Sequence, residues 1–497
     1  MYKDSSPEEI NTVMEVAWEA FHIYRGYSLK QRAGFMRAIA GEIGACGDAL
    51  IQTALQETNL PEARLRGERA RTIFQLESYA AACEKGDWLE ARIDTAIPDK
   101  NPPKPDIRKM LVPLGPVVVF GASNFPLAYS TAGGDTASAF AAGCPVIVKA
   151  HPAHPKTSGI IAAAINRAAE KTGMPKGIFA HVTGISFEVG KALVTHAHCK
   201  AVGFTGSFAG GKQLFDWANQ RPEPIPVFAE MGSVNPVFLL PDQLKQSAHE
   251  IANQYAASIT LGVGQFCTNP GLLIGIESDS LQTFVHDLGK AIQQSLPGIM
   301  LHQGIADAFA NKREEALMQE NVHLVAESLL AANDGESQRT GLPTIATVDG
   351  KTFLRNPLLH KEVFGPYSLV VRCADQWEML QVARHLEGQL TATLMATPAD
   401  IIRNRELLEA IKNICGRFIL NGVPTGVEVC LSMQHGGPFP ATTDSRFSSV
   451  GADAIKRFAR PLSFQNWPDE LLPEELKDAN PLRIRRTVND EGTEGAI

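Results

Sequence analysis

GPVVVFGASNFP (residues 115–126), STAGGDTASAFAAG (130–143) and CPVIVKA (144–150) predict a buried strand, a helix of small residues and a second buried strand in succession. The same alternation continues as far as AVGFTGS at 201–207. Strands that alternate with helices and read as continuous apolar runs indicate a parallel sheet with helices on both faces. The chain is therefore predicted to be an α/β protein.

Other segments differ from this one in their pattern of apolar, charged and proline residues. Residues 7–90 have helical spacing of apolar residues and open with Ser6-Pro7, a helix start. The proline-rich, charged PDKNPPKPDIRK at 98–109 predicts an exposed extended arm. A second α/β region covers roughly 233–421, with its clearest strands in NPVFLL, PGLLIGI and SLVVRC. The charged tail is expected to be irregular, with its last dozen residues disordered.

Composition narrows the function classes. The chain has 497 residues, a net charge of −8 and 44% hydrophobic residues, which suits a globular protein of two or three domains. The acidic balance argues against nucleic acid or an anionic membrane as partner. The polar start MYKDSSPEEI shows no secretory signal, and no apolar run approaches the roughly 20 residues that span a bilayer. Eight scattered cysteines without a CxxC pair indicate a reducing cytoplasm and mostly buried structural thiols.

Three residues at predicted strand ends or turns carry candidate chemistry. Cys267, in GVGQFCTNPG, is either a structural thiol or an exposed turn thiol whose pKa nearby amides lower. Glu230 ends the apolar run PIPVFAE and is either a general base or a solvated loop residue. Asn124, in GASNFP, is either an oxyanion donor or a turn residue.

The run GSFAGGK at 206–212 nearly matches a nucleoside-triphosphate phosphate loop. Gln213 stands where that loop needs Ser or Thr for magnesium, which argues against a triphosphatase. A strand, a Gly-Ser turn and a helix still form an anion site. The usual GxGxxG fingerprint is absent, so a dinucleotide would bind here in a variant way.

Six motifs occur in order: GASNFP, VIVKAHPAHP, GFTGS, FAEMGSVNP, GQFCTNPG and EVFGP. With them the chain resembles the aldehyde dehydrogenase superfamily from about residue 10 to 465. The resemblance implies three parts: a Rossmann-like cofactor domain, an α/β catalytic domain and a small oligomerisation arm. The cofactor domain would comprise 1–91 and 113–232 with a return segment at 422–450, the catalytic domain 233–421, and the arm and tail 92–112 and 451–497.

The resemblance also implies roles for the candidate residues. Cys267 would be the nucleophile that forms a thiohemiacetal and then, after hydride passes to the nicotinamide, a thioester. Asn124 and the backbone N–H of Cys267 would hold the oxyanion, and Glu230 would activate the hydrolytic water. The cofactor residues would be Lys149, Gly206, Ser207, Glu362 and Phe364; Lys149 and Phe364 could instead be a surface charge and a core residue. The chemistry needs no metal.

Departures from the common family motifs limit the resemblance to one subgroup of the family. EMGS replaces ELGG, Val234 replaces a lysine, and MQHGGPFPATTDSRFSSVG replaces the usual GGxKxSG. This form is similar to a subgroup that includes α-ketoglutaric semialdehyde (2,5-dioxopentanoate) dehydrogenases and an NADP-dependent fatty aldehyde dehydrogenase. His435 could approach the nucleophile or be a hydrogen-bonded loop residue. Arg446 is a candidate partner for a substrate carboxylate or a surface residue.

Pro152 stands where relatives that prefer NAD often carry a glutamate, so NADP is expected, with NAD tolerated. The expected reaction is oxidation of 2,5-dioxopentanoate to α-ketoglutarate, with a fatty aldehyde as the alternative substrate. CoA acylation is disfavoured by Glu230, while a cofactor-independent thiol esterase and a silent scaffold remain alternatives. The arm predicts a homodimer or homotetramer, because exposed strand edges are normally covered.

Overall fold

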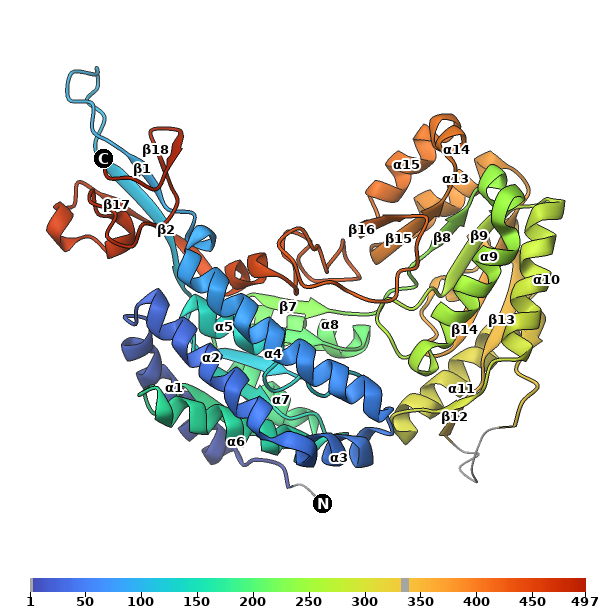
Figure 1. Ribbon diagram of the computed structural model, residues 1–497, viewed down its shortest axis with the longest axis horizontal. Helices are drawn as coiled ribbons and strands as arrows, with labels where there is room; N and C mark the ends of the chain where they lie inside the picture. Colours follow the sequence, from blue (N-terminus) through green and yellow to red (C-terminus); the bar gives the residue numbers. More distant parts are fainter. Residues whose placement is uncertain (1–2, 332–338) are drawn as a thin grey trace.

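The computed structural model describes residues 3–331 and 339–497. It has two α/β lobes and a smaller sheet that projects from the N-terminal lobe as an arm (Figure 1). Both lobes are built on mostly parallel sheets, which confirms the predicted α/β class. Across the described residues, every helix is too short or too polar to cross a membrane.

Four helices open the chain: α1 (Pro7–Tyr24), α2 (Leu29–Ala45), α3 (Gly47–Thr58) and α4 (Glu62–Lys85). The Glu9 backbone N–H donates to Ser6 Oγ at 3.2 Å, and the Ser6 N–H donates to Glu9 Oε2 at 2.8 Å. This reciprocal pair satisfies two amides at the helix start. It confirms the start predicted at Ser6-Pro7.

The N-terminal lobe contains a five-stranded parallel sheet in the order β5-β4-β3-β6-β7. Its strands are β3 (Val117–Phe120), β4 (Val146–Lys149), β5 (Phe179–Val182), β6 (Ala201–Thr205) and β7 (Val227–Glu230). The connecting helices are α5 (Gly134–Ala142), α6 (Pro155–Lys171), α7 (Phe187–Thr195) and α8 (Phe208–Asn219). The strand order reverses between β3 and β6, where loops diverge and open a crevice at the carboxyl ends of the strands. Asn124 follows β3 and Gly206 follows β6, so both residues lie at this crevice.

The second lobe contains a seven-stranded sheet in the order β11-β13-β14-β9-β8-β15-β16. Its strands are β8 (Val237–Leu239), β9 (Leu272–Ile276), β11 (His323–Glu327), β13 (Thr344–Asp349), β14 (Tyr367–Cys373), β15 (Gln389–Met395) and β16 (Cys415–Leu420). Its helices are α9 (Pro241–Thr260), α10 (Asp279–Gln293), α11 (Gln303–Leu317), α12 (Gly350–Arg355), α13 (Gln376–His385), α14 (Pro398–Arg403) and α15 (Arg405–Lys412). The strands predicted in NPVFLL, PGLLIGI and SLVVRC are β8, β9 and β14.

After β16 the chain returns toward the first lobe and runs between the two lobes (Figure 1). The Met231 N–H donates to the Ala441 carbonyl at 2.8 Å, and the Gly388 N–H donates to the Phe439 carbonyl at 3.2 Å. This return segment therefore bonds to the end of β7 in one lobe and to the start of β15 in the other. That course carries His435 to the space between the lobes.

The arm sheet has the order β17-β2-β1-β18-β19. Its strands are β1 (Arg92–Asp94), β2 (Ile107–Pro113), β17 (Ala459–Gln465), β18 (Arg486–Val488) and β19 (Glu491–Thr493). The prediction that the last dozen residues are disordered is wrong, because β18 pairs with β1. The buried Arg486 guanidinium also donates to the carbonyls of Lys477, Asp478 and Gly495, which holds the tail in place.

Candidate active site

Cys267 lies on the loop between α9 and β9. Residues 262–264 have positive φ angles of 56, 58 and 64°, which end the helical course of α9 and turn the chain. An added Cβ at Gly264 would lie 2.2 Å from the carbonyl carbon of Gly365, so the turn requires glycine. The Asn235 side chain donates to the Cys267 carbonyl at 2.9 Å. The loop that carries the thiol is thus held by a close backbone approach and a buried amide.

Glu230 and His435 meet the thiol from the other lobe and from the return segment. His435 Nε2 lies 3.0 Å from Glu230 Oε1 and 3.7 Å from Cys267 Sγ. The Ser449 hydroxyl donates to Glu230 Oε2 at 2.7 Å. Glu230 and His435 are both buried. One imidazole nitrogen therefore faces both a thiol and a carboxylate.

The contacts among Cys267, Glu230 and His435 change the pKa values of the thiol and the carboxyl group. Burial raises the pKa of the Cys267 thiol well above its ordinary range, and the Glu230 carboxylate beside it raises that pKa further. Burial also pushes the pKa of Glu230 upward, but His435 and Ser449 outweigh burial and hold it below the ordinary carboxyl value. The pKa of Cys267 thus moves in the direction opposite to that of an exposed turn thiol beside backbone amides, one of the two alternatives left open by the sequence. The burial of the thiol and a carboxylate from another lobe favour its neutral form.

Asn124 follows β3 and points its amide toward the Cys267 loop. Asn124 Nδ2 donates to the Gln265 carbonyl at 3.0 Å. A carboxamide has two N–H donors, so one stays available after this bond. Asn124 and Cys267 line the same cavity. The amide is thus bonded to the loop that carries the thiol and lines the same cavity.

A cavity of about 540 Å³ extends from the thiol along the crevice of the first sheet. Seven of the predicted site residues line it: Asn124, Gly206, Ser207, Glu230, Cys267, Glu362 and Phe364. The half-buried Lys149 ends β4 and is not part of this lining. Burial lowers the pKa of Lys149, and the carboxylate of Asp4 opposes that change.

The start of α8 forms one wall of the cavity. Ser207 caps the helix by accepting a hydrogen bond from the Gly210 N–H at 3.2 Å, and both residues line the cavity. Lys212 makes an ion pair with Asp216 at 2.6 Å. That pairing agrees with the departure from a triphosphate loop at Gln213, because the lysine of such a loop would face phosphate.

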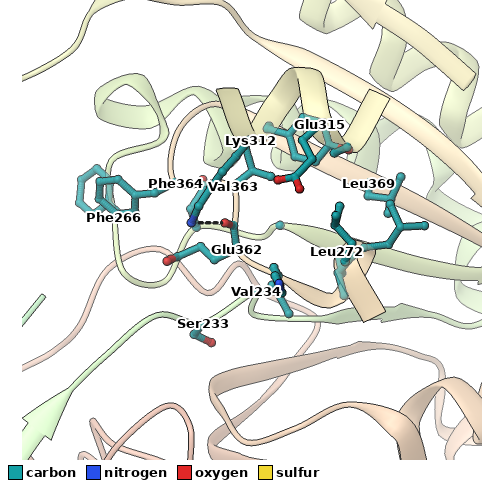
Figure 2. A pocket seen from close by; sticks show the side chains of 17 residues that line it. Ser233, Val234, Phe266, Leu272, Lys312, Glu315, Glu362, Val363, Phe364 and Leu369 are labelled. Atoms are coloured by element: carbon teal, nitrogen blue, oxygen red, sulfur yellow. Dashed lines mark hydrogen bonds between the residues drawn. The ribbon is translucent and has the colours of Figure 1, made fainter. Parts of the chain in front are cut away.

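Glu362 and Lys312 form the opposite wall. Lys312 Nζ donates to the Glu362 carbonyl at 3.0 Å (Figure 2). Burial raises the pKa of the Glu362 carboxyl to about 7, while the nearby Lys312 opposes that rise. A smaller cavity of about 50 Å³ lies beside the same two residues and includes Phe266 and Phe364 in its wall.

The structure shows two residues at the site that the sequence analysis missed, and it shows that one candidate, Arg446, lies outside the cavity. Ser449 and Lys312 were missed, because a serine in a loop and a lysine on the helix α11 have no local signal. Arg446 is exposed, and its guanidinium is paired with Asp444 at 2.6 Å. It does not line the cavity that contains Cys267.

The chain matches the model of the aldehyde dehydrogenase family over residues 1–444. It is 50% identical over 479 residues to α-ketoglutaric semialdehyde dehydrogenase 2 of Azospirillum brasilense, covering 96% of this chain and 90% of that protein. It is 44% identical to the α-ketoglutaric semialdehyde dehydrogenase of Acinetobacter baylyi, covering 98% of this chain and 92% of that protein.

The fold is also that of solved structures. One is the glyceraldehyde-3-phosphate dehydrogenase of Methanocaldococcus jannaschii complexed with NADP, with a TM-score of 0.75 and 20% identity, covering 93% of this chain and 95% of that chain. Structures with this fold include complexes with NADP and with NAD. The resemblance carried by the six motifs is therefore confirmed, and the chain belongs to the aldehyde dehydrogenase family and is an oxidoreductase.

Proposed function

We propose that this enzyme oxidises 2,5-dioxopentanoate to α-ketoglutarate through a thioester on Cys267, with a nicotinamide dinucleotide as oxidant. The observation that carries the proposal is the contact of Cys267, His435 and Glu230 beside the cavity, which brings together a nucleophile, a base and the imidazole that keeps the base ionised. The identity of 50% and 44% to two α-ketoglutaric semialdehyde dehydrogenases supports this substrate over a fatty aldehyde.

The first step needs a thiolate. Because the thiol is neutral at rest, its proton must leave to solvent as the aldehyde binds. The thiolate then forms a C–S bond with the aldehyde carbon, and negative charge develops on the aldehyde oxygen. The free N–H of Asn124 and the backbone N–H of Cys267 would donate to that oxygen. Such donors typically accelerate a reaction about 10²- to 10³-fold.

The residues of the cavity fit a dinucleotide. The N-terminal turn of α8, with Gly206 and Ser207, presents amides that suit a diphosphate. The Glu362 carboxylate suits ribose hydroxyls, with Phe364 packed beside it, and Lys149 would hold the adenosine ribose. The chemistry that a bound nicotinamide would supply is acceptance of hydride from the carbon attached to sulfur. Loss of that hydride would convert the adduct on Cys267 into a thioester. We expect NADP to be used and NAD to be tolerated, because Pro152 supplies no carboxylate against a 2′-phosphate.

Hydrolysis of the thioester needs a base that stays ionised. The pKa of Glu230 lies below the ordinary carboxyl value, so its carboxylate is available near neutral pH. It would accept a proton from water, whose oxygen attacks the thioester carbon and releases the carboxylate product and the thiol. A thiol esterase or a silent scaffold would leave the α8 wall and Glu362 without a role.

We further propose the three-part division predicted from the sequence, with cofactor-binding, catalytic and oligomerisation parts. Strands β16 and β17 end their sheets in the described chain and expose Phe418, Leu420 and Leu462. Exposed strand edges are normally covered, so we propose a homodimer or homotetramer. All eight cysteines are free thiols, which supports a reducing cytoplasm as the location.

The test is formation of reduced nicotinamide, followed by absorbance. Purified enzyme is given 2,5-dioxopentanoate or a long-chain aldehyde, each with NAD or NADP. The proposal predicts turnover of 2,5-dioxopentanoate by the wild type and none by Cys267→Ala. A preference for the long-chain aldehyde would overturn the substrate, and equal turnover by Cys267→Ala would overturn the mechanism.

A further inference from the structure

Helix α4 presents three charged residues on one face. Arg64, Glu68 and Arg71 are four and three residues apart, which places them on the same side of a helix. Glu68 Oε1 accepts hydrogen bonds from the Leu127 N–H at 2.8 Å and the Ala128 N–H at 3.0 Å. This face of α4 is therefore fastened to the loop that carries Asn124.

The two arginines reach that loop at its two ends. Arg64 Nη2 donates to the Asn124 carbonyl at 2.6 Å, and its guanidinium contacts the rings of both Phe125 and Phe266, 4.9 and 4.7 Å from their centroids. Arg71 Nη2 donates to the Tyr129 hydroxyl at 3.3 Å. Because Phe266 precedes Cys267, the cations of α4 lie close to the nucleophile.

A third guanidinium comes from the second lobe. Arg417, on β16, donates from Nη1 to the Gly426 carbonyl at 2.8 Å and from Nη2 to the Pro424 carbonyl. Burial lowers the pKa of Arg417, while the Cys267 thiol and the Tyr129 hydroxyl act on it in the opposite direction. Arg71 Nη1 donates to the Val427 carbonyl at 2.7 Å, next to the Gly426 carbonyl that Arg417 binds, so the two guanidinium groups meet on one loop from opposite lobes.

These cations lack anionic partners. Within the described residues, none of Arg64, Arg71 and Arg417 makes an ion pair with a carboxylate. Glu68 is the acid that acts on Arg64 and Arg71, so these two positive charges share one carboxylate. Arg64 Nη1 and Arg417 Nε are buried and have no hydrogen-bond partner. A buried N–H of a charged group without an acceptor is costly, which points to an acceptor supplied by a ligand.

We propose that Arg417 and Arg64, supported by Arg71, bind the carboxylate at the far end of the substrate while Cys267 reacts with its aldehyde. This inference rests on the proposed function and names the substrate class, a short aliphatic acid with an aldehyde at its other end. Guanidinium N–H groups match a carboxylate in geometry and charge. None of the three arginines lines the cofactor cavity, so the substrate's acid end and the dinucleotide occupy separate sites.

The same charges disfavour a fatty aldehyde. An apolar chain would cover partly buried guanidinium groups without offering them an acceptor, so it would remove their remaining water without compensation. Phe125, Phe266 and Tyr129 would contact the methylene groups between the two ends of the acid. The cluster therefore selects for a charged end at a short distance from the aldehyde.

The test compares a charged and an uncharged substrate of equal length, 2,5-dioxopentanoate and pentanal. Arg417→Met and Arg64→Met should each lower kcat/KM for the acid about 100-fold or more, mainly through KM, and change it less than about threefold for pentanal. Arg417→Lys keeps the charge but not the bonds to the 424–426 loop, and should recover part of the loss. Arg446→Met, which removes an exposed arginine paired with Asp444, is the matched control and should leave both substrates unchanged.

Equal losses for the acid and pentanal in both methionine variants would overturn the inference, since these arginines would then only support the structure. Calorimetric binding of α-ketoglutarate provides a readout that needs no turnover. Binding to the wild type that is lost in Arg417→Met and Arg64→Met supports the carboxylate site, even if 2,5-dioxopentanoate is not oxidised and the proposed substrate fails. Unchanged binding in these variants, or no binding to the wild type, overturns the site even in an active enzyme.

Discussion

His435 Nε2 lies 3.0 Å from Glu230 Oε1, although the two residues come from a returning loop and from the end of a strand in the first sheet. The same nitrogen lies 3.7 Å from the sulfur of Cys267. The imidazole N–H that faces Glu230 helps to hold the pKa of that carboxylate below its ordinary value. His435 thus keeps ionised, beside the nucleophile, the residue that later serves as the base.

Replacement of His435 should shift the pH dependence of the reaction. In His435→Asn the Glu230 carboxylate loses the imidazole that holds its pKa down, so less of the base is ionised at neutral pH. We expect kcat at neutral pH to fall about 10²- to 10⁴-fold and to recover as pH rises. The measurement is a pH profile of kcat, with the exposed His385→Asn as control. A profile that matches the wild type would rule out this role.

Removal of the Ser449 hydroxyl should act through Glu230. The hydroxyl donates to the carboxylate at 2.7 Å, and a hydrogen bond to a charged group contributes about 1.5–3 kcal/mol. In Ser449→Ala the pKa of Glu230 should rise, so the acid limb of the deacylation rate should move to higher pH. Ser449→Thr keeps the hydroxyl and should keep the limb in place. The same shift in both variants would show that the hydroxyl is not the cause.

Asn124→Ala should slow the reaction about 10²- to 10³-fold by removing an oxyanion donor. The side chain also bonds to the Gln265 carbonyl, so the variant should lose only about 1 kcal/mol of unfolding free energy. Steady-state kinetics and thermal unfolding check the two effects. A rate within about threefold of the wild type would remove Asn124 from the catalytic site.

Gly264→Ala should displace the loop that carries Cys267. The new Cβ would meet the Gly365 carbonyl carbon at 2.2 Å, at a backbone φ of 64°. We expect a loss of more than about 1 kcal/mol in unfolding free energy together with most of the activity. Gly67→Ala is the control: it lies in α4 with open space around its Cβ position, so it should stabilise the helix by about 0.5–1 kcal/mol. A fully active Gly264→Ala variant would contradict this role of the turn.

Much of the fold could be predicted from the sequence, because its evidence is local. Apolar runs bounded by turns predict β3, β4, β8 and β9, and the carboxyl ends of parallel strands bring Asn124 and Glu230 to one edge. The order of the motifs also indicates that Cys267 joins them, because that order resembles the order in the aldehyde dehydrogenase family.

Interactions between distant segments could not be predicted in this way. The raised pKa of Cys267 depends on burial and on a carboxylate from the other lobe. Arg417 and Arg71 reach neighbouring carbonyls of one loop only when β16 and α4 are folded, so the sequence alone offered Arg446, as either a carboxylate partner or a surface residue. Asp4 lies beside Lys149 because the first residues pair with the end of β5, where the Ser5 N–H donates to the Thr183 carbonyl. This contact adds a negative charge near Lys149 that no local motif predicts.

The central claim, an acyl-enzyme on Cys267 that Glu230 hydrolyses, is tested most directly by trapping that intermediate. Glu230→Gln is mixed with 2,5-dioxopentanoate and NADP, quenched in acid and analysed by peptide mass spectrometry. The account predicts one burst of reduced cofactor per active site and an α-ketoglutaryl thioester on Cys267, absent without the cofactor. A free Cys267 after the burst, or an adduct on the exposed Cys430 instead, would contradict it.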